Sequence, residues 1–185
     1  MQSKTKIISG AERLKNLQRI KDAFTVKKIY TGCHGQLKFI LQYLHHYVYF
    51  LRKKDYERAT LMLYVIEKEY QNILSLDQVV LSLGVNPFCE KVCLLGDYVY
   101  KTSGKNTTEK ILIDDIVAKL ITSKTYKMAM CKISDISAKA VLEKIIISEE
   151  KLIKALENSF DKLRSKSNKS PLDLQLQLQK QGVFC

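Results

Sequence analysis

Two glutamates, Glu67 and Glu149, occupy positions where paired carboxylates could bind metal ions. Three residues after each glutamate, on the same face of a helix, the chain places Tyr70 and Leu152. Carboxylate oxygens bind hard cations, and an imidazole at the third position would complete the coordination sphere. Neither position holds a histidine, so the sequence has the spacing of a metal site without the complete set of ligands.

The pattern around these glutamates occurs twice in the chain. Gln36 and Lys119 lie 83 residues apart, each is followed seven residues later by a tyrosine, and Glu67 and Glu149 lie 82 residues apart. Dimetal four-helix bundles are built this way, with one Glu from each of two helices and a Glu-x-x-His from each of the other two. The duplication therefore predicts a helical bundle, and the residue types make its metal chemistry incomplete.

The composition agrees with long helices in a single domain. Of the 185 residues 46% are hydrophobic, and there are only seven glycines and two prolines. Apolar periodicity predicts an all-α, antiparallel four-helix bundle over residues 31–164, and its helices are expected at about 35–53, 55–83, 106–131 and 134–164. The residues expected to begin or end these helices are Asp55, Gly84, Pro87, Asn106 with Glu109, and Ser134 or Asp135.

The segments outside these helices differ in charge and in length. Residues 84–106 form a long connection, which would let the third helix lie parallel to the second as in ferritin-like bundles. Residues 1–30, with a short helix expected over 11–24, carry eight basic and two acidic residues and are interpreted as a basic arm. Residues 165–185 are interpreted as a polar tail, also basic, in which leucine alternates with Asp or Gln from Leu172 to Leu178.

Three stretches of the sequence resemble bacterial ferritin-like proteins of the rubrerythrin and manganese-catalase kind. The stretch Gly35–Tyr43 is similar to their first helix, Glu67–Pro87 to their second, and Glu143–Glu150 to their fourth. The resemblance covers about residues 30–160 and implies a ferritin-like fold with a long crossover between the second and third helices. In that family the metal ligands would fall on Gln36, Glu67, Tyr70, Lys119, Glu149 and Leu152.

Only two of these six positions hold the family's ligand type. Gln36 is a neutral amide and Lys119 a cation where the family has carboxylates, and both histidine positions are replaced. A lysine in such a place could be a nucleophile with a lowered pKa. We favour the alternative, in which Lys119 forms a buried ion pair with Glu67 and Glu149 and replaces the metal as their counter-charge. Catalytic residues and cofactors are therefore not expected.

Three functions remain open from the sequence. We favour a non-catalytic structural or protein-interaction role, with self-association or another protein as the partner. The alternatives are a divergent oxidoreductase that binds iron or manganese through Glu67 and Glu149, and a module that binds nucleic acid or an anionic surface through its basic ends. No run is apolar for the roughly 20 residues of a membrane span. The five cysteines lack Cys-x-x-Cys spacing, which favours reduced thiols and a cytoplasmic protein; the resemblance also extends to spore-associated proteins.

Removal of residues 166–185 tests the boundary between the bundle and the tail. We expect helical content and cooperative unfolding to stay nearly unchanged, because the tail lacks the apolar stripe of a core helix. Circular dichroism and the melting temperature of the truncated chain measure this. A large loss of stability, or a change in mass in solution beyond the removed residues, would show that the tail belongs to the fold or to an interface.

Overall fold

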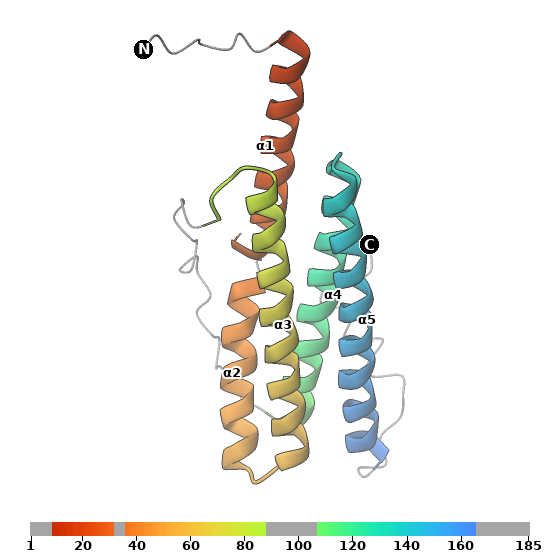
Figure 1. The fold of residues 1–185 in the computed structure, drawn as a ribbon. Coiled ribbons are helices and arrows are strands. Elements are labelled where there is room, and N and C mark those ends of the chain that lie inside the picture. Colours follow the sequence, from red (N-terminus) through yellow and green to blue (C-terminus); the bar gives the residue numbers. More distant parts are fainter. Residues whose placement is uncertain (1–8, 32–35, 88–106, 166–185) are drawn as a thin grey trace, which may run out of the picture.

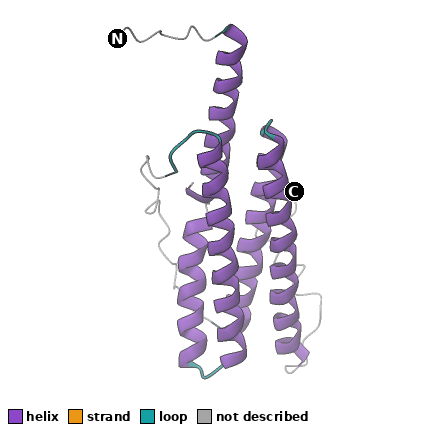
Figure 2. Cartoon of the chain, viewed as in Figure 1, coloured by secondary structure: helices purple, strands orange, loops and turns teal. Residues whose placement is uncertain are grey.

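The computed structural model describes residues 9–31, 36–87 and 107–165, and most of these residues lie in helices (Figures 1 and 2). No strand occurs among them, which confirms the all-α prediction. None of the described helices combines the length and the apolar character that crossing a membrane requires. The helices are α1 (Gly10–Thr31), α2 (Gln36–Arg52), α3 (Tyr56–Ser82), α4 (Thr108–Lys132) and α5 (Ile136–Ser165).

A tight turn makes α2 and α3 an antiparallel hairpin. The carboxylate of Asp55 accepts a hydrogen bond from the backbone N–H of Arg58 at 3.3 Å, which confirms Asp55 as the N-cap of α3. At the other end of α3, Gly84 takes a φ of +87°, a conformation that glycine adopts without steric cost. Its N–H returns to the carbonyl of Leu81 at 2.9 Å and ends the helix.

The second hairpin consists of α4 and α5. The expected cap of α4 was Asn106, which lies outside the described residues; the N-cap is Thr107, whose hydroxyl accepts from the N–H of Lys110 at 3.2 Å. At the start of α5, the Asp135 carboxylate accepts from the N–H of Ala138 at 2.9 Å, and the helix begins where the sequence predicted.

Side-chain contacts between the hairpins establish the helix directions. From α2, Gln36 contacts Tyr126 and Gln42 contacts Asp115 of α4, so residue numbers rise along one helix as they fall along the other. These two helices are antiparallel. Since α3 is also antiparallel to α2, α3 and α4 run in the same direction (Figure 1).

The helix α1 is longer than the expected 11–24 and contributes to the core. Its second half buries Ala23, Val26 and Tyr30 against the bundle, whereas its first half projects beyond the end of the bundle (Figure 1). The buried carboxylate of Asp22 accepts from the backbone N–H groups of Ser134 and Asp135, both at 2.9 Å. This carboxylate ties α1 to the turn between α4 and α5.

The core consists of two apolar clusters on either side of a polar layer. One cluster lies around Leu76, Tyr126 and Leu142 and includes α1, whereas the other lies around Phe50, Ile116 and Leu156. Between them every helix of the two hairpins contributes a buried polar residue, and these are Gln36, Glu69, Asn72, Lys119 and Glu149. This layer occupies the level of the bundle where the sequence predicted paired carboxylates.

Candidate functional site

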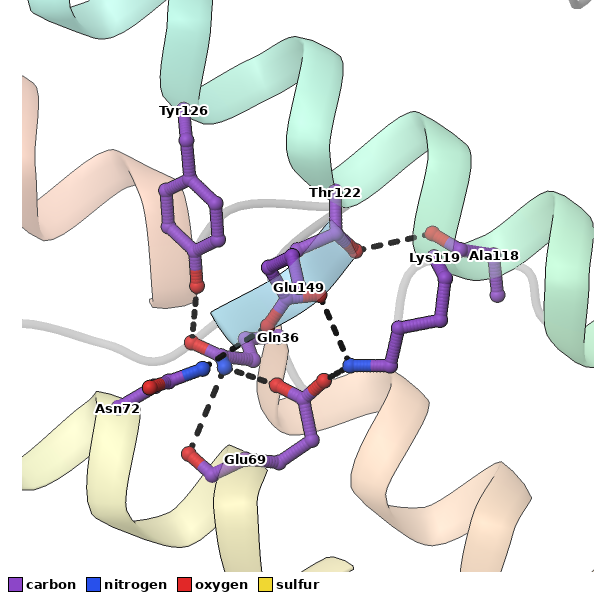
Figure 3. A network of polar contacts seen from close by, with 8 residues as sticks. All are labelled: Gln36, Glu69, Asn72, Ala118, Lys119, Thr122, Tyr126 and Glu149. Atoms are coloured by element: carbon purple, nitrogen blue, oxygen red, sulfur yellow. Dashed lines mark hydrogen bonds and ion pairs between the residues drawn. The ribbon is translucent and has the colours of Figure 1, made fainter. Parts of the chain in front are cut away.

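The ammonium group of Lys119 is the centre of the polar layer. Its side chain is fully buried, and Nζ lies 2.9 Å from Oε2 of Glu149 and in contact with the carboxylate of Glu69 (Figure 3). Glu69 and Glu149 are likewise buried, with 1% and 0% of their surface exposed. The predicted pair between Lys119 and Glu149 is present, and one cation on α4 bridges two carboxylates on α3 and α5.

The predicted partner Glu67 is wrong, because the structure places Glu69 in the layer. Glu67 is exposed and accepts a hydrogen bond from Gln71 at 3.2 Å, and Tyr70 is 58% exposed. Two residues along a helix correspond to a rotation of about 200°, so Glu67 and Glu69 point to opposite faces. The signal was present in the sequence, since Glu69 continues the buried spacing of Met62 and Val65.

The residue three positions after Glu69 is Asn72, at the place where a dimetal site has histidine. Its Nδ2 donates to Oε1 of Glu149 at 2.8 Å, so Asn72 satisfies a carboxylate that a metal would otherwise contact (Figure 3). The corresponding position on α5 is Leu152, which is 1% exposed and packs in the apolar cluster. With Glu67 as the expected ligand, the position three residues later is Tyr70, so the spacing in the sequence did not indicate Asn72.

Gln36 links the layer to Tyr126 as a two-sided hydrogen-bonding group. Its Nε2 donates to the carboxylate of Glu69 and, at 3.4 Å, to the Glu69 carbonyl. Its Oε1 accepts from the hydroxyl of Tyr126 at 2.6 Å (Figure 3). An amide can donate and accept at once, whereas a carboxylate here would add a negative charge beside Glu69. A glutamine rather than a glutamate therefore suits a layer that contains one lysine and two acids.

Burial and neighbouring charge act in opposite directions on Lys119. Burial lowers the pKa of Lys119, and the charge of Glu149 and its hydrogen bond to Lys119 raise that pKa again. The ring of Tyr43 lies below the ammonium, with its centroid 5.3 Å from Nζ, and adds a cation–π contact. Both carboxylates and the aromatic ring therefore favour the charged form that burial disfavours.

A second polar group lies on the α2–α4 side of the layer. Oδ1 of the fully buried Asp115 accepts from Nε2 of Gln42 at 3.0 Å and lies 2.7 Å from Nδ1 of His46. Burial raises the pKa of Asp115, while the hydrogen bond and charge of His46 lower it. Gln42 and His46 are spaced by four residues and so share a helix face, but their spacing does not indicate that both contact Asp115 on another helix.

A groove of about 490 Å³ between α3 and α5 reaches the edge of the polar layer at Asn72. Serine and glutamine side chains of α3 line it together with the start of α5, and Lys119 is not among the lining residues. A lysine nucleophile must reach its substrate, and the contacts of Lys119 are all internal. The geometry therefore favours the ion-pair interpretation of Lys119 over a catalytic one.

Comparisons of the chain with protein-family models, curated proteins and solved structures found no match. Within the described residues, no three His, Cys, Asp or Glu side chains lie together in a way that could hold a metal ion. Of the cysteines, only Cys131 is among these residues, and its thiol is free and exposed.

Substitution of Lys119 by Met tests whether its charge holds the layer together. We expect the free energy of unfolding to fall by about 3–5 kcal/mol, because Glu69 and Glu149 would be left buried without a counter-charge. Chemical denaturation measures the loss, and further replacement of Glu69 and Glu149 by Gln should restore part of it. Glu67→Gln is the matched control and should leave stability nearly unchanged. A large effect of this control would return Glu67 to the core.

The buried tyrosines predict a loss of stability in alkali. Burial, and then the charge of Glu149 among other neighbours, raises the pKa of Tyr43 and Tyr126 well above the usual value of a phenol. Above about pH 10 the unfolded chain releases these protons while the folded chain keeps them, so stability falls as pH rises. Replacing both tyrosines by Phe should reduce this slope, and Tyr64→Phe, at a side chain that is 43% exposed, should not. Lys119 is common to all three proteins, so its titration cancels in the comparison; equal slopes would contradict the prediction.

Proposed function

We propose that this chain is a ferritin-like bundle in which an ion triad has replaced the dimetal centre, and that it has a non-catalytic structural or protein-interaction role. The helix directions support the fold, since α3 and α4 are parallel and the hairpins pack as α2 on α4 and α3 on α5. In a four-helix bundle whose second and third helices are parallel, here α3 and α4, the connection between them must run along the length of the bundle. This is the ferritin-like arrangement.

The position of Lys119 carries the proposal. Its ammonium lies between the two carboxylates of the layer, where two divalent cations would lie in a bundle of this class. A protonated lysine offers no lone pair and repels a cation, so ammonium and metal exclude each other there. The remaining donors fit no better, because Gln36 and Asn72 are neutral and Leu152 has no donor atom. The residues present do not fit a dimetal cofactor.

A bundle whose core is held by its own lysine needs no metal to fold. Metal-dependent domains gain folding free energy from their ligands, whereas this layer supplies its counter-charge from α4. The functional parts of such a chain are then its surfaces, and a role in contacts with other chains follows. Cytoplasmic location stays a prediction from the sequence.

Elemental analysis of the full chain, purified without chelators after expression in iron- and manganese-rich medium, tests the proposal. We expect less than about one equivalent of iron, manganese or zinc per chain, because four of the six ligand positions lack a metal-binding group. The matched variant replaces Gln36 and Lys119 by Glu and Asn72 and Leu152 by His. It should gain metal where the natural sequence does not. Two tightly held metals in the natural sequence would overturn the proposal.

A further inference from the structure

The outer face of the α2–α3 hairpin carries two exposed apolar stripes. On α2, four exposed apolar residues are separated by three, four and three positions. On α3, three exposed residues are separated by seven positions each, and a fourth follows four positions later. The eight side chains, 38–64% exposed, are Leu41, Leu44, Val48, Leu51, Tyr56, Leu63, Tyr70 and Leu74. The stripe on α3 also includes one exposed acid, Glu67, four residues after Leu63 and three before Tyr70, whereas α2 contains no acidic residue.

The two stripes lie side by side along the seam between the helices. On α2, Gln42 and His46 face α4, and the stripe occupies the opposite side of that helix. On α3, Asn72 faces α5, and the stripe again occupies the opposite side. Each stripe therefore flanks the partner helix of the hairpin, and together they form one continuous surface, named here the hairpin face.

The register of the hairpin aligns the stripes residue by residue. The turn at residues 53–55 fixes one end, and the contact of Gln36 with Glu69 fixes the other. Counting away from the turn places Leu51 level with Tyr56, and Leu44 level with Leu63. The hairpin face is therefore a strip along both helices, with Leu44 and Leu63 near its middle.

The size of the hairpin face indicates that it is covered. Its exposed fractions add up to about four complete large side chains, or on the order of 800 Å² at about 200 Å² each. A monomer rarely exposes a contiguous apolar patch above about 300–600 Å², whereas a standard protein interface buries about 800 Å² on each partner. The area matches one side of a stable dimer.

We infer that the hairpin face binds the same face of a second copy of this chain. An isologous pair needs a surface that is complementary to itself. This largely apolar strip meets that condition, because a twofold axis near Leu44 and Leu63 places the two Glu67 side chains, each four residues along α3 from the axis, on opposite sides of it. Stripes spaced by three and four residues also suit helix packing at about 20°. The inference deepens the proposed interaction role by naming its partner and surface.

Sedimentation equilibrium of the full chain and of single Leu→Glu variants tests this interface. The natural sequence is expected to be a dimer, and Leu44→Glu and Leu63→Glu should each reduce the mass about twofold, because they bury a carboxylate at the centre of the interface. Circular dichroism should show unchanged helicity, since both side chains point away from the core. Ile147→Glu on α5, where the side chain is 53% exposed, is the matched control and should remain dimeric.

Two results would overturn the inference. One is that the natural sequence stays monomeric up to about 100 µM. The face would then be covered by residues 88–106 or by another protein, and not by a second copy. The other is a dimer that survives both leucine substitutions. Metal analysis of the same sample separates this inference from the proposed function. A dimer with two metals per chain refutes only the proposed function, and a metal-free monomer refutes only the dimer.

Discussion

The ion triad of Lys119, Glu69 and Glu149 is the constraint on which the rest of the bundle depends. Two carboxylates are buried at mid-height of a helical core, away from bulk water, and apolar side chains cannot satisfy them there. Lys119 reaches both, and the side-chain amides of Gln36 and Asn72, both in the α2–α3 hairpin, donate hydrogen bonds to them. With all three groups ionised the triad keeps one negative charge, which the donors of Gln36 and Asn72 face. Truncating any one member would leave another buried group unmatched.

Such a layer contributes to specificity more than to net stability. The desolvation of buried ions offsets much of their attraction, and an apolar layer of the same volume could be as stable. The layer takes one residue from α2, one from α4 and one from α5, and two from α3, so a helix that slides by one turn loses its partners. A mismatched arrangement would cost several kcal/mol in unpaired buried groups. The two apolar clusters, which tolerate small shifts, are thereby held in one register.

Much of the fold could be predicted from the sequence, because helix starts and ends depend on residues that are close together in the chain. Asp55 as a cap and Gly84 as a stop are read from one residue and its neighbours, and the structure bears both out. The site could be predicted only in part. Lys119 and Glu149 were found from the duplicated spacing. The acid on α3 was wrongly identified as Glu67, because Glu69 lies only two residues away and is an equally plausible carboxylate. Only the period of the buried residues around them decides between the two, and a motif match ignores that period.

The contribution of α1 was harder to predict because it depends on a distant contact. The sequence around Asp22 reads as part of a basic arm, and its role becomes visible only when its carboxylate meets the backbone of Ser134 and Asp135 across the bundle. The same holds for the outer side of the α2–α3 hairpin. Periodicity places Leu41 and Leu44 on an apolar stripe of α2. The opposite side of that helix, with Tyr43 and Phe50, packs in the core. A helix that is apolar on two sides has more surface to bury than one bundle offers. The inner side of the hairpin fixes the register of the chain, and the outer side is the face for which a second copy is proposed.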